Sequence, residues 1–253
     1  MLSSLKILVI ISVIFLFVFF YIPLIEMFIY SLKSENPIEN YVSILKNPLY
    51  IRIIGYSLLI SFLTTIISLI ISYPIAYYLA FIINEKFKSI ILIAFIAPFW
   101  VNFLLRTYAL YNVLYMIGII NNFIALLIGM VYDYYPYMLL SIYAALSKIS
   151  KSILDASFLF GASPFQRFTK IILPLSMPGI IAGSIFVSLT TMTEFVVPSM
   201  LGGVEGYTVG YLIWDLFLKY RNWFKGSALS IIIISIALII SLFYSRKAKV
   251  VLI

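Results

Sequence analysis

The chain has 253 residues, of which 64% are hydrophobic and 10% are charged, and its mean hydropathy is +1.15. These values lie far outside the usage of soluble globular proteins, so the sequence predicts an all-α integral membrane protein. It contains no Cys, no His and no phosphate-binding-loop motif, which excludes thiol catalysis, imidazole bases, disulfides and nearly all structural zinc sites. We therefore expect no catalytic residue, no metal and no cofactor in this chain; an intramembrane enzyme built on Asp133 and Glu194 is the alternative.

Six charge-poor runs are long enough to cross a membrane as helices, which need about 20 apolar residues. The second lies in a charge-free stretch that exceeds the length of one span, which implies tilt or a buried end. Between the third and fourth, the segment 106–122 is apolar and aromatic, as expected of a re-entrant or interfacial piece. The predicted spans are 7–25 (continuing to 30), one within 53–84, about 89–105, about 123–146, about 171–193 and about 227–244.

The first span resembles a secretory signal in one respect, because Lys6 precedes its apolar run. The run is too long for a signal peptide and lacks a small-x-small cleavage site. We therefore expect it to remain in the mature protein.

The distribution of Lys and Arg predicts the orientation. If both termini face the cytoplasm, ten basic residues lie inside and seven outside, and the short inner loops carry the bias most clearly. The net charge of +8 is spread over membrane edges, so we expect anionic lipid and not nucleic acid as its partner. The inner set is Lys6, Lys86, Lys88, Lys148, Lys151, Arg167, Lys170, Arg246, Lys247 and Lys249; the outer set is Lys33, Lys46, Arg52, Arg106, Lys219, Arg221 and Lys225.

The inner segment 147–170 differs from the other inner loops because it is long, polar and compatible with helix. Gly161 allows a reversal between two helices, and Ala156, Ala162 and Ser163 keep the surface low enough for another protein to approach. Such a segment suits docking of a helix into a partner's groove. An ordinary cytoplasmic loop with a glycine turn is the alternative.

Asp133 lies about ten residues into the fourth span, roughly 15 Å deep. A carboxylate there costs about 2.5 to 3.5 kcal/mol on insertion scales, so it should face a cavity or a partner. Tyr137 shares its helical face, and a carboxylate flanked by aromatic rings suits a flexible polycation. The alternative is that Asp133 pairs with a basic or hydrogen-bonding residue between subunits.

Three further residues are candidates for the substrate path. Glu194 follows the fifth span, roughly 30 Å from Pro174, which predicts a place near the outer mouth where it receives a cation. Trp100 and Tyr108 flank the outer end of the third span. The alternatives are a solvated helix end for Glu194 and interfacial anchors for the two aromatic residues.

The inner segment also resembles a known loop. Asp155-Ala156-Ser157, Gly161 and Ile172-Leu173-Pro174 resemble the "EAA" loop of binding-protein-dependent ABC importer permeases, with Asp-Ala-Ser where Glu-Ala-Ala is usual. The segments 98–108, 174–183 and 201–203 resemble the spermidine/putrescine branch of that family, and the similarity covers nearly the whole chain.

The resemblance implies a type I ABC importer permease (MetI-like) fold: one transmembrane domain over 1–253 in a bacterial cell membrane, with an ATPase-coupling loop at 147–170. It implies a homologous second permease, two cytoplasmic ATP-binding subunits that hydrolyse ATP, and an extracytoplasmic solute-binding protein as partners. Polyamines are the implied cargo; ferric iron, an inorganic anion or a phosphonate are alternatives, as is a carrier or scaffold that needs no ATPase. The implied coupling residues are Asp155, Ala156, Ser157, Gly161, Ala162, Ser163, Leu173 and Pro174.

Overall fold

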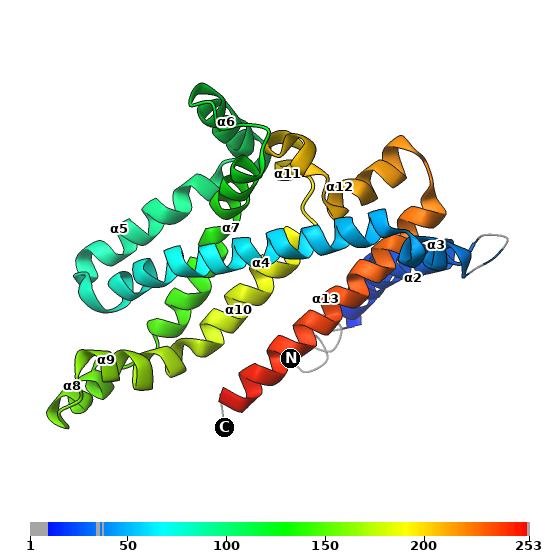
Figure 1. Ribbon diagram of the computed structural model, residues 1–253. Helices are drawn as coiled ribbons and strands as arrows, with labels where there is room; N and C mark the ends of the chain where they lie inside the picture. Colours follow the sequence, from blue (N-terminus) through cyan, green and yellow to red (C-terminus); the bar gives the residue numbers. More distant parts are fainter. Residues whose placement is uncertain (1–9, 34–35, 37, 252–253) are drawn as a thin grey trace. The chain divides into compact units, whose positions relative to one another are not determined.

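The computed structural model describes residues 10–33, 36 and 38–251, and these residues form helices and no strand (Figure 1). The helices are α2 (Ile22–Ser31), α3 (Glu39–Lys46), α4 (Pro48–Tyr77), α5 (Glu85–Ile96), α6 (Phe103–Met116), α7 (Phe123–Leu146), α8 (Lys151–Leu159), α9 (Pro164–Arg167), α10 (Leu173–Met192), α11 (Val196–Leu201), α12 (Val209–Trp214) and α13 (Trp223–Val251). Short 3-10 or π-helical segments extend them: η1 (Phe17–Tyr21), η2 (Tyr78–Ile82), η3 (Ala97–Trp100), η4 (Phe168–Ile172), η5 (Gly203–Gly206) and η6 (Asp215–Lys219).

Five helices in the described residues are long and apolar enough to span a membrane, and a bent pair brings the number to six if it is one span. The all-α, six-span prediction is thus confirmed, and the fourth span matches its predicted bounds. Residues 7–9 of the predicted first span lie outside the described residues. The five helices are Ile10–Ser31, Pro48–Ile82, Phe123–Leu146, Pro164–Met192 and Trp223–Tyr244; the bent pair is Lys86–Trp100 with Phe103–Met116.

The third predicted span is shorter than expected and is broken. Its helix ends at Trp100, not near Leu105, and the chain turns by 94° before α6 begins. The Asn102 side chain accepts a hydrogen bond from the Leu104 N–H at 2.9 Å, so it caps a new helix at this point. The segment predicted to be re-entrant or interfacial is therefore mostly helical.

The fifth predicted span begins earlier than expected. Ser163 and Gln166 form a reciprocal capping box, which starts a helix at Pro164. That helix continues without interruption through η4 and α10 to Met192, a length of 29 residues. The end of the inner loop is therefore part of the span itself.

The chain divides into two compact units. One holds the chain up to Arg52 together with Leu212–Ile236, and the other holds Ile53–Tyr211 together with the residues from Ala237 onward. The prediction of a single permease domain over 1–253 stays a prediction. The candidate site residues all belong to the second unit.

Helices α7 and α10 pack against each other along most of their length in the second unit (Figure 1). Gly179 makes this possible, because a Cβ atom there would lie 2.5 Å from the Ser141 backbone oxygen. Side chains from both helices and from α4 fill the core around this contact. Small residues commonly allow such close approach between membrane helices.

Hydroxyl groups of α4 fix this helix to the other two. Ser61 Oγ donates to the Ser188 carbonyl of α10 at 2.7 Å, and Ser72 Oγ donates to the Tyr135 carbonyl of α7 at 3.0 Å. Both serines are buried. Hydrogen bonds of this kind hold helices together where lipid offers no hydrophobic driving force.

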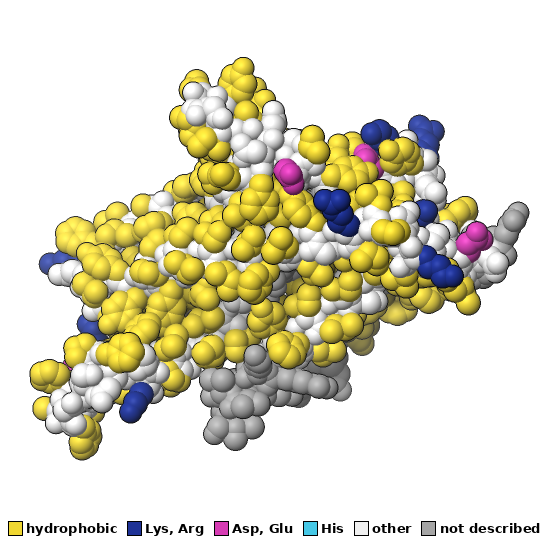
Figure 2. Space-filling view, viewed as in Figure 1, with side chains coloured by type: hydrophobic (Ala, Val, Ile, Leu, Met, Phe, Trp, Pro, Cys, Tyr) yellow, Lys and Arg dark blue, Asp and Glu magenta, His cyan; other side chains and the backbone are white. Residues whose placement is uncertain are grey.

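The face in Figure 2 is covered mainly by hydrophobic side chains, with few charged ones. Large apolar side chains such as Phe15, Phe62 and Leu238 are at least 59% exposed. A surface of this kind is unfavourable in water and suits the hydrocarbon of a bilayer.

Candidate functional site

Asp133 forms a buried ion pair with Arg106. The Arg106 Nε donates to Asp133 Oδ1 at 2.7 Å, and the Thr107 hydroxyl donates to Oδ2 at 3.0 Å. Asp133 is 1% exposed and Arg106 is 7% exposed. This agrees with the alternative in which Asp133 pairs with a basic residue. The partner belongs to the same chain, however, and not to another subunit.

Aromatic rings surround the guanidinium of Arg106. Its Cζ lies 4.0 Å from the centre of the Phe99 ring, 5.8 Å from that of Tyr132 and 5.9 Å from that of Phe103. The electron-rich faces of such rings attract a cation. The rings and Asp133 together hold α6 against α7 just after the break at Asn102.

Glu194 lies directly after the end of α10 and is held by α7 and by its own backbone. The Tyr134 hydroxyl donates to Glu194 Oε2. Glu194 Oε1 accepts from the N–H groups of Phe195 at 3.0 Å and Val196 at 2.7 Å, at the start of α11. Glu194 as a whole residue is half-buried. Its carboxylate is fixed in position by three hydrogen bonds.

Glu194 lies beside the middle of α7. Its partner Tyr134 follows Asp133 directly in the chain, so both acids are bound through the same part of α7. After α10 the chain folds back, and Val197 and Leu201 of α11 pack on the first half of α7. The predicted position near the outer mouth assumes a helix that continues outward, and it stays a prediction.

Tyr137 lies in a cluster of rings that includes Tyr134, the residue that donates to Glu194. Its ring centre is 6.2 Å from that of Tyr134, 4.6 Å from that of Phe186 on α10 and 6.1 Å from that of Phe99. Tyr137 is 39% exposed. The structure thus brings three of the predicted substrate residues, Asp133, Tyr137 and Glu194, to one region.

Trp100 and Tyr108 lie on either side of the break between α5 and α6. Trp100 is 77% exposed, and Tyr108 is 55% exposed and stacks on Tyr111 at 6.2 Å. High exposure is common to residues of a pore and to interfacial anchors. Their place on a substrate path stays a prediction.

Sequence reasoning missed Arg106 as a partner of Asp133 and the bond from Tyr134 to Glu194. The charge count places Arg106 among the outer positive charges, although it is a basic residue in an apolar region that also holds a lone acid. Charges inside membranes usually pair with one another, and that rule is the signal that points to Arg106.

The inner loop forms a helix reversal, as its composition predicts. Gly161, with φ of 76°, lies in the turn between α8 and α9. Asp155, Ala156 and Ser163 are exposed. Ser157 is buried and donates to the Leu154 carbonyl at 2.7 Å, so it stabilises α8 instead of contributing to the surface.

Large apolar side chains project from this reversal. Four of them, Phe158, Leu159, Phe160 and Phe165, are 66%, 84%, 91% and 76% exposed. The Arg167 guanidinium lies 5.6 Å from the centre of the Phe158 ring and links α9 to α8. Leu173 and Pro174 lie at the first turn of α10, and Ala162 is half-buried in the turn. An apolar surface on a short reversal is typical of a protein interface.

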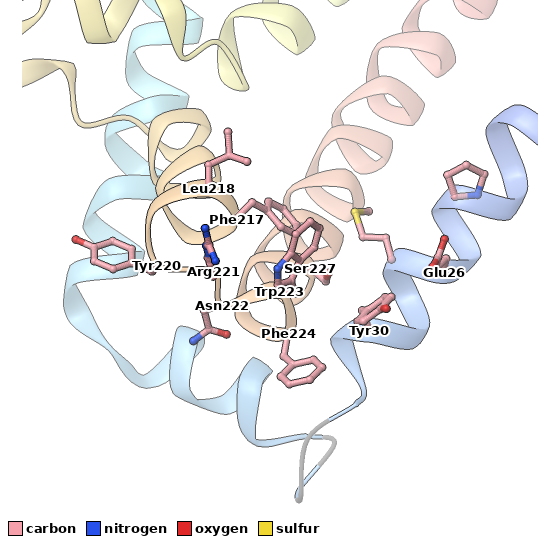
Figure 3. Close-up of a pocket in the computed structure, with 12 residues that line it drawn as sticks. Glu26, Tyr30, Phe217, Leu218, Tyr220, Arg221, Asn222, Trp223, Phe224 and Ser227 are labelled. Carbon is pink, nitrogen blue, oxygen red and sulfur yellow. The ribbon is translucent and has the colours of Figure 1, made fainter.

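A separate groove of about 1120 Å³ lies in the first unit (Figure 3). Glu26 and Tyr30 of α2 line one side, and Arg221 and Trp223, next to the start of α13, line another. None of the predicted substrate residues lines it.

The comparisons with known proteins agree with these features. Residues 72–248 match the family described as binding-protein-dependent transport system inner membrane component. The chain is 37% identical to the spermidine/putrescine transport system permease protein PotB of Haemophilus influenzae, over 82% of this chain and 78% of the relative. It is 32% identical to PotB of Escherichia coli K12, over 86% of this chain and 84% of the relative.

Solved structures share the fold at low sequence identity. A chain of a bacterial ABC transporter that imports the acidic polysaccharide alginate superposes with a TM-score of 0.78 at 16% identity, covering 98% of this chain and 95% of that one. A chain of the MetNI methionine ABC transporter, in an inward-facing conformation, gives 0.65 at 15% identity, covering 79% and 95%. The chain therefore belongs to the family of binding-protein-dependent transport system inner membrane components, which are membrane permeases and not enzymes.

Proposed function

We propose that this chain is the permease subunit of an ATP-driven ABC importer of polyamines. The observation that carries the cargo assignment is the Glu194 carboxylate, held in place by Tyr134, whose ring in turn lies 6.2 Å from that of Tyr137. The names of the PotB relatives point to the same cargo.

The chemistry around Glu194 suits an alkylammonium group. In the part of the chain that the structure describes, no Lys or Arg lies within ion-pair distance of Glu194, whereas Asp133 is already paired with Arg106. The Glu194 carboxylate attracts an ammonium group. The rings of Tyr137 and Phe186 offer apolar and cation–π contacts to the carbon chain of the polyamine. The same site repels an anion.

The inner reversal is the proposed dock for the ATPase. Its exposed Phe160 and Leu159 suit a groove on a cytoplasmic ATP-binding subunit, of which two copies bind to the importer. A homologous second permease completes the path, and an extracytoplasmic solute-binding protein delivers the cargo. ATP is bound and hydrolysed by the partners.

One continuous helix connects the dock to the cargo site. It begins at Pro164, three residues after Gly161, and ends at Met192, two residues before Glu194. At 1.5 Å per residue it is about 43 Å long. Closure of the ATPases moves the reversal, and this helix carries the displacement to the break that holds Glu194, so the path opens outward; hydrolysis resets it inward.

The proposed location is a bacterial cell membrane with both termini in the cytoplasm. Lys148, Lys151, Arg167 and Lys170 lie on or next to the reversal, so the proposed ATPase side is also a basic side. This arrangement follows the positive-inside rule.

Uptake in cells tests the proposal. The chain is expressed with the permease, ATPase and binding protein encoded in neighbouring reading frames, in a host that cannot make or import polyamines. Labelled putrescine or spermidine should accumulate, and accumulation should stop when the ATPase lacks its phosphate-loop lysine. Uptake of ferric iron, phosphate or a phosphonate with no response to either amine would contradict the polyamine assignment and leave the importer class standing.

A further inference from the structure

The groove of the first unit is lined by two charged side chains of opposite sign (Figure 3). Glu26 comes from α2, and Arg221 comes from the turn between η6 and α13. Among the residues that the structure describes, neither side chain forms an ion pair or a hydrogen bond. The groove therefore offers one group that binds a cation and one that binds an anion.

This groove lies at the ends of two membrane spans. Glu26 is in the last two turns of the first span, and Arg221 lies two residues before the last span begins. The rings of Tyr30 and Phe224 stack with their centres 6.3 Å apart, so the end of the first span and the start of the last span lie side by side. Phospholipid headgroups occupy this level of a bilayer.

Most other residues that line the groove are apolar or aromatic. Met27 and Phe217 line it, together with the exposed side chains of Leu218 and Trp223. Trp and Tyr are enriched where hydrocarbon meets water, because their rings are apolar and carry one polar group. The volume of about 1120 Å³ is large enough for a headgroup and the first part of its acyl chains.

The turn that carries Arg221 has a fixed backbone. Arg221 has φ of 51°, a left-handed conformation that is uncommon for a residue other than Gly. The Asn222 N–H donates to the Leu216 carbonyl at 2.8 Å, and the Asn222 side chain accepts from the Lys225 N–H at 3.1 Å. Conformations of this kind persist where the surrounding structure enforces them, and they are common at ligand-binding sites.

We propose that this groove binds phosphatidylethanolamine, with Arg221 on the phosphate and Glu26 on the ammonium group. A guanidinium donates several N–H bonds to phosphate oxygens, and a carboxylate accepts bonds from a primary ammonium. The exposed apolar side chains of Ile22 and Ile25 on α2 are available to the acyl chains. Such a lipid contacts both the first and the last span and supports their packing.

The pair of unlike charges favours this lipid over two others. Phosphatidylglycerol has a phosphate for Arg221 but no cationic group for Glu26. The ammonium of phosphatidylcholine carries three methyl groups and no N–H donor. Binding of the lipid does not depend on which cargo the permease carries.

Native mass spectrometry of the purified, delipidated transporter complex tests the proposal. The complex is titrated with the dioleoyl forms of phosphatidylethanolamine, phosphatidylglycerol and phosphatidylcholine, and Kd is measured for the first lipid bound. The Kd for phosphatidylethanolamine should be at least about fivefold lower than that for either other lipid, because only this lipid makes both charge-assisted contacts.

Two variants separate the roles of the two charges. Glu26→Gln should raise the Kd for phosphatidylethanolamine about fivefold or more without weakening the other two lipids, because only the primary ammonium loses its partner. Arg221→Asn should weaken all three lipids about tenfold, since each has a phosphate. Asn tolerates the left-handed conformation, so the turn is kept. Arg221→Lys retains the positive charge and should retain the preference.

Matched controls change the same charges elsewhere in the first unit. Glu39→Gln and Arg52→Gln alter exposed residues that do not line the groove, and they should leave every Kd within about twofold of the natural value. A loss of preference in either control would show that net charge, and not the groove, selects the lipid, and would overturn the inference.

Three further outcomes would overturn it. One is equal affinity of the natural sequence for the three lipids, and another is a preference that survives Glu26→Gln. The third is loss of the second permease from the Arg221→Asn complex, which would show that the groove is a subunit interface. A complex that carries another cargo and still selects phosphatidylethanolamine would contradict the proposed function alone.

Discussion

The hydroxyl of Tyr134 donates a hydrogen bond to the carboxylate of Glu194 and so joins the middle of α7 to the break between α10 and α11. Helices that are interrupted beside a polar group are a recurrent way to build substrate sites in membrane transporters. Here the interruption lies at the end of the helix that begins next to Gly161. The proposed cargo site and the proposed coupling loop therefore lie at the two ends of one continuous helix.

Replacement of Glu194 by Gln should reduce polyamine uptake at least about tenfold, because the charge that attracts an ammonium is lost while the shape is kept. Tyr134→Phe should reduce uptake less, since two backbone N–H groups still hold Glu194 Oε1. Initial rates of labelled putrescine uptake measure both effects. Glu39→Gln, at an exposed position of α3, is the control. An unchanged rate in Glu194→Gln would remove this residue from the path.

Asp133→Asn should destabilise the protein by about 3 to 5 kcal/mol, because it leaves the buried Arg106 without its counter-charge. Asp133→Asn combined with Arg106→Gln should recover much of that loss, since neither charge then remains. Thermal unfolding in detergent, followed by size-exclusion fluorescence, reports both variants. Equal stability of Asp133→Asn and the natural sequence would show that the pair does not form.

Gly179→Ala should weaken the packing of α7 on α10. The added Cβ would lie 2.5 Å from the Ser141 backbone oxygen, and a backbone atom cannot move aside as a flexible side chain can. The expected loss is about 1 to 3 kcal/mol, measured by the same thermal assay. Gly55→Ala is the matched control, because nothing lies within 4 Å of its Cβ position and it should be neutral or slightly stabilising. Equal behaviour of the two variants would contradict the close approach.

The apolar runs predict most of the fold. The fourth span coincides with α7 because a charge-poor run bounded by Asn122, whose side chain accepts from the Ala125 N–H, has clear ends. High hydropathy continues past Trp100 and predicts a third span that runs to about Leu105, whereas only the capping by Asn102 marks the break. One capping residue changes the mean hydropathy of a long apolar run very little, so hydropathy alone does not reveal the break.

The sequence predicts which acids belong to the candidate site, but it does not predict the contacts that these acids make. Asp133 and Glu194 stand out because acids are rare in apolar sequence. The partners of these acids do not stand out in the sequence, because they are distant along the chain. Arg106 is 27 residues from Asp133, and Tyr134 is 60 residues from Glu194. Such pairs exist only once α6, α7 and α10 have packed, so a single sequence cannot specify them.

Gly161→Val should impair coupling without loss of the membrane fold. Gly161 has φ of 76°, a conformation that costs a β-branched residue about 1 to 2 kcal/mol, and the turn carries the exposed Phe160. Co-purification of the ATP-binding subunit and amine-stimulated ATP hydrolysis should both fall. Gly161→Asn should be milder, because Asn tolerates this conformation. Full ATPase recovery and full uptake with Gly161→Val would contradict the docking role.

The most direct test of polyamine import is transport into proteoliposomes that contain the purified complex, with ATP on the side of the ATP-binding subunits and the solute-binding protein on the other. Labelled spermidine or putrescine should accumulate on the ATP side, and accumulation should be lost with a non-hydrolysable ATP analogue and strongly reduced by Glu194→Gln. Accumulation that needs no ATP, or an active complex that carries neither amine, would contradict the account.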